Sequence, residues 1–441
     1  MAKIKRFVLA YKWWLVAIAV PVLYLLYLLL KYGVNVPFWD EWEIVTLLQK
    51  HDAGTLSLYD FWAQHNEHRL LFPQLIMVYL GFLTHWNLNA ELLVSFAFAA
   101  ASLLLVLHML YRNFGATRRP VMIALGIFAA VLFFSPMQWE NWLWGWQIEW
   151  YMVIFGAIAT VWAITSWPKS WPERLALPVA IATAFFATYS LGNGPFTWIV
   201  GAVLLFLMGS SRRKLLVWGG AAAVTLASHY YHYSGSAGQP PKSLLLHEPL
   251  QYIEYVFIYM GRPLAFDIHT SFIFGGIIAL ACGWALWRII QKRNVPIIAL
   301  PWVGLVMFGA MSALSTGISR LGYGRQQAFS NRYMTVSMLL TLGIVVLVIT
   351  LWPTAKKTKK ATQARVQQYV LASVAVLTLI LAINYPKGVH SFANQSQYLK
   401  DIQRCTKAPN PYDICLLSAY PNKDRVRGMI NYLKEKHLSS Y

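Results

Sequence analysis

The chain has 441 residues, of which 58% are hydrophobic and only 12% charged, and its formal net charge is +20. Soluble domains carry roughly 25% charged residues, so this composition excludes an ordinary soluble protein. The basic residues stand in short clusters between apolar runs, which is typical of the cytoplasmic loops of a membrane protein. That pattern explains the positive charge better than nucleic-acid binding does.

Apolar runs close to the roughly 20 residues that a helix needs to cross a bilayer recur along the chain. Backbone hydrogen bonds must be closed within the segment in lipid, so long uniform runs of this kind predict helices. The sequence therefore predicts an all-α transmembrane bundle of about eleven spans over residues 1–384. The runs lie near residues 13–30, 91–111, 120–135, 150–167, 175–190, 197–210, 214–230, 271–288, 295–314, 333–352 and 366–384.

The first run predicts a retained anchor, because "KYGVNVPF" after it offers no small-residue cleavage site. Six basic clusters indicate the cytoplasmic side: "MAKIKR", "YRNFGATRR", "PKSWPER", "SRRK", "RIIQKRN" and "TAKKTKK". The N-terminus is then inside and the small C-terminal segment, residues 385–441, outside. The outer loops are expected near 31–90, 136–149, 191–196, 231–270, 315–332 and 385–441.

Residues 70–85, "LLFPQLIMVYLGFLTH", are an exception to this alternation. They form a mostly apolar stretch of about 16 residues, which is short for a crossing. Charged "HNEHR" precedes them and His85 with Trp86 closes them, which suits the interfacial zone. We expect a juxtamembrane helix here, within a first outer loop of residues 31–90. The alternative is a twelve-span protein with basic residues outside.

The predicted outer loops concentrate carboxylates, aromatic residues and arginines on one membrane face. The first loop begins with "VNVPFWDEWEIV", and a later one reads "SPMQWENWLWGWQIEWY". Tryptophans at span ends are commonly an aromatic belt, and acids at a span exit are commonly solvated. Acids near lipid nevertheless indicate function when arginines suited to phosphate share their face. The "HNEH" pair has no third ligand at a telling spacing, so we expect no divalent metal and no certain cofactor.

The first loop resembles that of the GT-C superfamily of membrane glycosyltransferases, which take sugar from a polyprenyl-phosphate carrier. In aminoarabinose and mannosyl members, a span is followed by D-E, a K-P-P-L-like segment, a short juxtamembrane helix and N-x-E. Here "WDEWE", "HNEHRLLFPQL" and "WNLNAELL" stand in those places. His68, Arg69 and Pro73 replace the K-P-P-L segment, and no WWD-type signature is present, which argues against transfer to protein sequons.

This resemblance implies a GT-C-type fold and an enzyme of the hexosyl- or pentosyltransferase class in a bacterial inner membrane. Its active site would face the periplasm and move one monosaccharide from the lipid carrier to a hydroxyl of a cell-envelope glycan, such as O-antigen or lipopolysaccharide, with inversion. The implied partners are the lipid-linked donor, the glycan acceptor and the bilayer, and not nucleic acid. The family's catalytic acid maps onto Asp40, with Glu41 beside it as the alternative base.

The leaving lipid phosphate is a stable anion that needs charge stabilisation more than protonation. The candidates for that role are Arg69, Arg325 and Arg332, followed by Arg262 and Arg320. Polar and aromatic residues of the outer loops are candidates for holding sugar or acceptor, and Glu140 and Glu149 could instead orient the base. These candidates are Glu140, Glu149, Gln138, Trp139, His65, His68 and Asn193.

Two other functions stay open at this point: an O-antigen polymerase or ligase, and a transporter or flippase for lipid-linked sugars. A transporter would place charge near the midplane and show paired repeats with broken helices, and the sequence shows neither. A polymerase or ligase relies less on an acidic pair just after the first span. In the tail, Cys405 and Cys415 bracket "TKAPNPYDI", a turn that a disulfide could close in an oxidising compartment.

Overall fold

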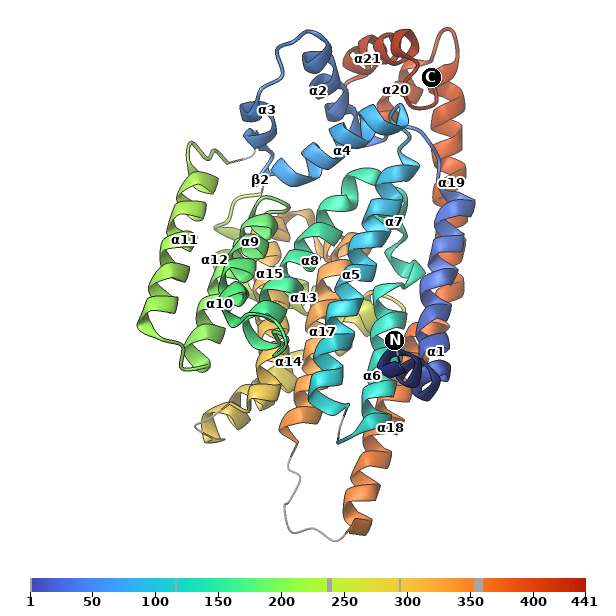
Figure 1. Ribbon diagram of the computed structural model, residues 1–441. Helices are drawn as coiled ribbons and strands as arrows, with labels where there is room; N and C mark the ends of the chain where they lie inside the picture. Colours follow the sequence, from blue (N-terminus) through green and yellow to red (C-terminus); the bar gives the residue numbers. More distant parts are fainter. Residues whose placement is uncertain (1, 116, 236–239, 293–294, 353–359) are drawn as a thin grey trace.

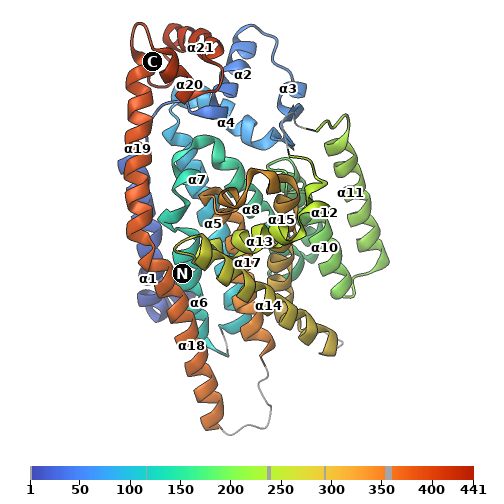
Figure 2. The same cartoon turned by 180° about the vertical axis from the view of Figure 1, so that it is seen from behind.

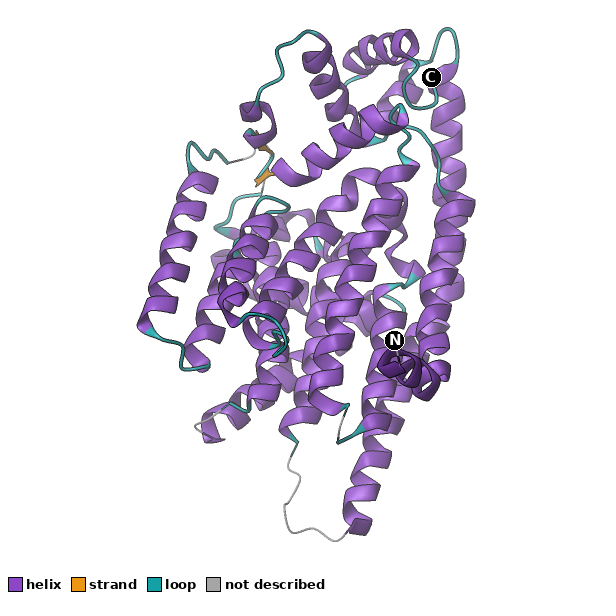
Figure 3. Cartoon of the chain, in the orientation of Figure 1, coloured by secondary structure: helices purple, strands orange, loops and turns teal. Residues whose placement is uncertain are grey.

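The computed structural model describes residues 2–115, 117–235, 240–292, 295–352 and 360–441. Nearly all of the described chain is helical (Figure 3), with one short antiparallel hairpin formed by β1 (Gln64–His65) and β2 (His68–Arg69). The predicted basic cluster "TAKKTKK", apart from its last lysine, and the end of "RIIQKRN" lie outside the described residues.

Most long helices run side by side in a bundle (Figure 1). They are α1 (Ala2–Tyr32), α5 (Asn89–Phe114), α6 (Arg119–Phe133), α8 (Ile148–Thr165), α14 (Ile268–Lys292), α15 (Leu300–Arg320), α17 (Asn331–Leu351) and α18 (Lys360–Ile383). The most enclosed is α17, in which 83% of the residues of the most apolar stretch are buried. It packs against α15, α14 and α13. An apolar helix enclosed on all sides is typical of the centre of a membrane bundle.

Eight helical segments in the described part of the chain are long and apolar enough to cross a membrane. They are Trp13–Tyr32, Asn89–Phe114, Arg119–Leu143, Gly145–Thr165, Ile268–Gln291, Ile297–Tyr323, Asn331–Leu351 and Ala364–Lys407. Each coincides with a predicted apolar run, so the prediction of an all-α, multi-pass membrane protein is confirmed at this level.

The remaining three predicted runs form shorter or less apolar helices: α9 (Ala176–Thr188), α10 (Phe196–Leu207) and α11 (Arg212–Tyr230). The first two have 13 and 12 residues. At 1.5 Å per residue they are about 20 Å long or less, below the roughly 30 Å of a bilayer core. The count of about eleven spans therefore stays a prediction.

Short helices and 3-10 turns connect the bundle helices. They are α7 (Trp139–Leu143), α12 (Leu244–His247), α13 (Pro249–Gly261), α16 (Arg325–Ala328) and the 3-10 turns η2 (Pro136–Gln138), η3 (Gly145–Gln147), η4 (Glu173–Leu175), η5 (Arg262–Leu264), η6 (Ile297–Ala299) and η7 (Leu321–Tyr323).

A cap covers the end of the bundle, and it is built from two distant parts of the chain (Figures 1 and 2). The first loop supplies η1 (Trp39–Glu41), α2 (Trp42–Asp52), α3 (Leu58–Trp62) and α4 (Leu71–Thr84). The C-terminal segment supplies the end of α19 (Tyr385–Lys407), α20 (Asp413–Ala419) and α21 (Lys423–Lys436). These parts share one hydrophobic core, in which Trp42 and Leu48 of the loop belong to the same cluster as Leu416 and Leu433 of the tail.

The predicted juxtamembrane helix over 70–85 corresponds to α4, which starts and ends within one residue of that range. It runs obliquely across the bundle end in Figure 1, whereas the bundle helices stand upright. Its last turn closes at His85, whose φ of 51° is left-handed and ends the helix. Its position in a bilayer stays a prediction.

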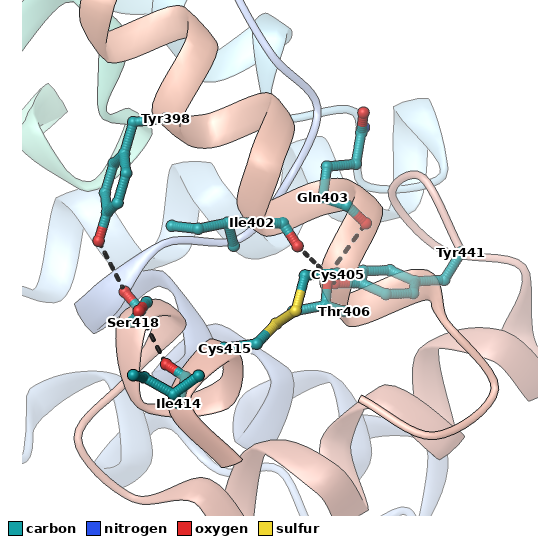
Figure 4. Close-up of a disulfide and its surroundings, with 9 residues drawn as sticks. All are labelled: Tyr398, Ile402, Gln403, Cys405, Thr406, Ile414, Cys415, Ser418 and Tyr441. Carbon is teal, nitrogen blue, oxygen red and sulfur yellow. Dashed lines mark hydrogen bonds between the residues drawn. A yellow bond between two sulfur atoms is a disulfide. The ribbon is translucent and has the colours of Figure 1, made fainter. Parts of the chain in front are cut away.

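The C-terminal segment is tied together by a disulfide (Figure 4). Cys405 on α19 and Cys415 on α20 are bonded, with 6.2 Å between their Cα atoms, inside the usual range for such bridges. The hydroxyl of the last residue, Tyr441, donates to Thr406 Oγ1 at 2.6 Å. Residues 385–441 were predicted as a small C-terminal segment, and the part from the end of α19 onward completes the cap together with the first loop.

Candidate functional site

A cavity of about 730 Å³ lies where the cap meets the bundle. Its walls come from η1, the β1–β2 hairpin, the N-terminal ends of α8 and α17, the C-terminal ends of α11 and α15, and the turn at residues 191–193. This volume is within the range of small-molecule sites, roughly 300–1,000 Å³. The predicted site residues that line it are Asp40, His65, His68, Glu149, Asn193, Arg320 and Arg332.

Asp40 reaches this cavity from a tightly fixed turn. The preceding residue, Trp39, has a φ of 50°, a left-handed conformation that is uncommon for a tryptophan. Neighbouring bonds hold the turn in place: Trp144 Nε1 donates to Phe38 O at 3.0 Å, and Phe38 N donates to Glu41 Oε2 at 2.7 Å. Strained backbone of this kind persists only where the surroundings determine it, and it is commonly found at functional sites.

The carboxyl group of Asp40 lies in a mixed electrostatic field. Burial raises its pKa above the ordinary value of 3.8, and the negative charge of Glu43 adds to that rise. The neighbouring His65 and Arg332 act in the opposite direction and lower the pKa. The net effect is a rise, which makes this carboxylate a better proton acceptor than a solvated aspartate.

Two arginines bring positive charge to the cavity, and each is already paired. Arg332 Nε lies 2.9 Å from Glu140 Oε1, and Arg320 pairs with Glu67. The contact of Arg332 uses Nε, which leaves its two terminal nitrogens without a hydrogen-bonding partner among the described residues. A guanidinium group held at one edge in this way is suited to binding an anion with the other edge.

Several buried polar atoms of the cavity wall have no protein partner within the described chain. They are Glu149 Oε2, Asn193 Oδ1, Gln147 Oε1, His68 Nδ1 and His229 Nδ1. An unsatisfied buried polar atom costs about 1–3 kcal/mol, so these atoms make this part of the wall less stable than a fully bonded one. The residues that carry them all line the cavity, so polar side chains form a large part of its wall.

His68 approaches the cavity through a close backbone contact. A Cβ atom at Gly192 would lie 2.3 Å from His68 Nδ1, so a larger residue in this turn would force the imidazole to shift. Burial, followed by the influence of His65, lowers the pKa of His68 to about 3. The imidazole is therefore neutral at physiological pH and can accept or donate a hydrogen bond, but it does not supply positive charge.

A stripe of hydroxyl groups on α15 also lines the cavity, and the sequence reasoning missed it. It consists of Ser312, Ser315, Thr316 and Ser319. The spacing i, i+3, i+4 and i+7 places all four on one helix face. That period was visible in "MSALSTGISR", but the segment was divided between an apolar run and an outer loop.

Two predicted site residues have structural roles instead. Glu41 is buried behind η1, where it accepts hydrogen bonds from Phe38 N and from Trp146 N at 3.2 Å, and it does not line the cavity. Burial, then the charge of Glu91, raises the pKa of Glu41 well above its ordinary value. Its role is to fasten the Asp40 turn to η3, so the alternative assignment of Glu41 as the base has no geometric support.

Arg69 is also structural. Its Cζ lies 3.7 Å from the centre of the Trp62 ring. Its side chain donates to three backbone carbonyls, those of Trp62, His229 and Tyr231. All of its donor nitrogens are thus engaged in holding the hairpin against the end of α11. A phosphate-binding role for Arg69 is not supported by this geometry.

The structure corrects three further predicted roles. Arg262 is buried, and its Cζ lies 4.1 Å from the centre of the Phe329 ring. Its Nε donates to Phe329 O at 2.9 Å. Gln138 is buried and donates to backbone carbonyls at the end of α6, while accepting from Thr335 Oγ1 at 2.7 Å. Arg325 pairs with Glu254 at 3.2 Å and does not line the cavity.

Trp139 and Glu140 lie outside the main cavity, in the wall of a smaller one of about 250 Å³. No group of three or more His, Cys, Asp or Glu side chains in the described part of the chain is placed to hold a metal ion. Comparison of the chain with protein-family models, curated proteins and solved structures found no match. The geometry of the cavity therefore carries the functional argument.

Proposed function

We propose that the protein is a membrane glycosyltransferase that moves a monosaccharide from a polyprenyl-phosphate carrier to a hydroxyl of a cell-envelope glycan. The single observation that carries this proposal is that Asp40 and Arg332 line one cavity together with polar side chains such as Glu149, Asn193 and His68. A proton acceptor, an anion-binding group and sites for sugar hydroxyls are the three elements that such a transfer needs.

The proposed reaction is one direct displacement. Asp40 accepts the proton of the acceptor hydroxyl as its oxygen bonds to the anomeric carbon of the donor sugar. The bond between that carbon and the phosphate oxygen breaks, and the electron pair leaves with the lipid phosphate. The terminal nitrogens of Arg332 stabilise this anion, with Arg320 as the second candidate. A single displacement inverts the configuration of the anomeric carbon.

The neutral residues of the cavity suit the sugar itself. Glu149, Asn193 and His68 line the cavity, and side chains of these types can donate hydrogen bonds to sugar hydroxyls or accept them. Trp146 and Trp150 line the same cavity and supply flat apolar surfaces for a pyranose face. The ends of α8, α15 and α17, which are long and apolar enough to cross a membrane, form part of the wall, and this suits a substrate whose lipid tail remains in the bilayer.

The test is transfer by the purified full-length protein, using a panel of polyprenyl-phosphate-linked sugars. Asp40→Asn is expected to lower the rate by about 10²–10⁴-fold, the usual contribution of a general base. Asp52→Asn is the control, because Asp52 lies in the cap and pairs with Lys436 at 3.0 Å, away from the cavity. Full transfer by the Asp40→Asn variant would exclude this residue as the base.

A further inference from the structure

A second cavity of about 250 Å³ adjoins the main one. Phe38, Trp39, Trp139, Glu140, Trp144, Arg332 and Gln395 line it. Three of these residues, Trp39, Trp144 and Arg332, line the main cavity as well. The two cavities therefore meet at the residue that precedes Asp40 and at the arginine that faces it.

The walls of the second cavity are mostly aromatic. Phe38 stands at the centre of the cluster, with its ring centroid 6.2 Å from that of Trp39 and 5.5 Å from that of Trp144, both edge to face. Trp39 is 43% exposed although its backbone is fixed in a left-handed conformation. Large rigid aromatic surfaces that stay accessible next to polar groups are suited to contact with a ligand.

Polar groups complete this cavity in a pattern suited to hydroxyls. The Glu140 carboxylate is oriented by Arg332 at 2.9 Å and lies 3.4 Å from Ser330 Oγ. The side-chain amide of Gln395 on α19 and the indole N–H groups of Trp39 and Trp139 make no hydrogen bond within the described chain. A carboxylate, an amide and two indole donors around aromatic rings match a sugar ring, which has polar edges and an apolar face.

We propose that this second cavity binds the terminal sugar ring of the acceptor glycan, with the ring stacked on Trp39 or Trp139 and its hydroxyls bonded to Glu140 and Gln395. The main cavity, which is larger and is lined by Arg320 and Lys242 in addition to the shared Arg332, takes the lipid-linked donor. This assignment rests on the proposed glycosyl transfer. The volume suits one sugar unit, and the rest of the glycan extends outward because the cavity is partly open.

The experiment measures saccharide binding and transfer separately. Intrinsic tryptophan fluorescence of the detergent-purified full-length protein is titrated with methyl glycosides of glucose, galactose, mannose, rhamnose and N-acetylglucosamine. Trp139→Ala and Gln395→Leu are each expected to weaken binding of the preferred glycoside at least 10-fold. In transfer assays they are expected to raise KM for the acceptor while leaving KM for the donor within about 2-fold.

Gln397→Leu is the matched control, because Gln397 is exposed on the same helix and donates to Asp401 Oδ1 at 3.1 Å. Absence of binding by every glycoside of the panel would overturn the inference, as would unchanged binding and acceptor KM in both cavity variants. If Asp40→Asn abolishes transfer in that case, the proposed function survives without this subsite. If the wild type binds a glycoside but transfers no sugar, and the cavity variants lose that binding, the sugar-binding subsite is supported and the proposed transferase activity is refuted.

Discussion

The ion pair between Glu43 and Arg425 is expected to hold the C-terminal part of the cap on the first loop. Arg425 Nη1 and Nη2 donate to the two oxygens of Glu43 at 2.5 and 2.6 Å, and Nη2 also donates to Thr46 Oγ1 at 3.0 Å. Tyr420 donates to the same carboxylate at 2.5 Å. Arg425→Met removes this bidentate pair and leaves the Glu43 charge half-buried.

The magnitude follows from the geometry and the exposure of the pair. Hydrogen bonds to a charged group contribute about 1.5–3 kcal/mol each when buried. The side chains of Arg425 and Glu43 are 35% and 22% exposed, so solvent screens part of this contribution. We expect a net loss of about 2 kcal/mol, which is about a 30-fold increase in local opening of α21 at 1.4 kcal/mol per tenfold.

Amide hydrogen exchange across Val426–Leu433 measures this opening directly, because α21 packs its buried face on the loop. Arg427→Met is the control on the same helix: Arg427 pairs with Asp413 at 2.9 Å, both half exposed, and such surface pairs contribute about 0–1 kcal/mol. Equal exchange rates in the Arg425 and Arg427 variants would refute the reasoning.

The same pair predicts a pH dependence. Burial alone would raise the pKa of Glu43, but hydrogen bonds from Arg425 and Tyr420 outweigh it and lower the pKa below the ordinary value of 4.5. A carboxylate with a lowered folded-state pKa stabilises the fold above its unfolded pKa, and that stabilisation is lost as the pH falls through the folded value. Protection of α21 should therefore fall below about pH 4.5 in the wild type, and this dependence should be absent from Arg425→Met.

Three further predictions concern the cavity and the tail. The transfer rate is expected to fall on acidification as Asp40, whose pKa is raised above 3.8, becomes protonated, and a pH–rate profile that is flat down to pH 3.8 would contradict this. Gly192→Ala places a Cβ 2.3 Å from His68 Nδ1, so donor affinity should fall by about 10-fold or more in a binding assay, without loss of the folded protein. Cys405→Ser removes the bridge to Cys415, which closes a loop of 10 residues and is expected to contribute about 2–3 kcal/mol, so α20 should exchange faster; unchanged exchange would show that packing alone holds it.

The sequence predicted the bundle well because membrane helices are specified locally. Long apolar runs report directly on what must be buried in lipid, so the eight apolar segments all fall on predicted runs. The number of spans in the region of α9 to α11 could not be predicted as well, because apolar composition alone does not give the length of a helix. Runs such as 175–190 are apolar enough to resemble spans, yet α9 ends at Thr188 after 13 residues, where the chain turns toward the cavity.

The arginines of the site could not be sorted from sequence, because their roles depend on partners far along the chain. Arg69 donates to His229 O, 160 residues away, and Arg262 to Phe329 O, 67 residues away. An arginine whose nitrogens bind backbone carbonyls looks the same in sequence as one that faces a ligand. Arg332 differs only because its neighbour across the cavity wall is Glu140, which comes from another loop.

The acidic run after the first span is explained by three different partners within four residues. Asp40 faces the cavity, Glu41 points behind the turn to the backbone of Trp146, and Glu43 faces outward to Arg425 of the tail. Successive residues of a tight turn point in different directions, so one short segment contacts the main cavity, the bundle and the cap at once. Glu41 holds the turn to the bundle through Trp146, and Glu43 holds it to the C-terminal tail through Arg425. The position of Asp40 therefore depends on both the bundle and the tail. A change in the tail that frees Glu43 should therefore alter the proposed transfer as well as the stability of the cap, since the charge of Glu43 acts on Asp40.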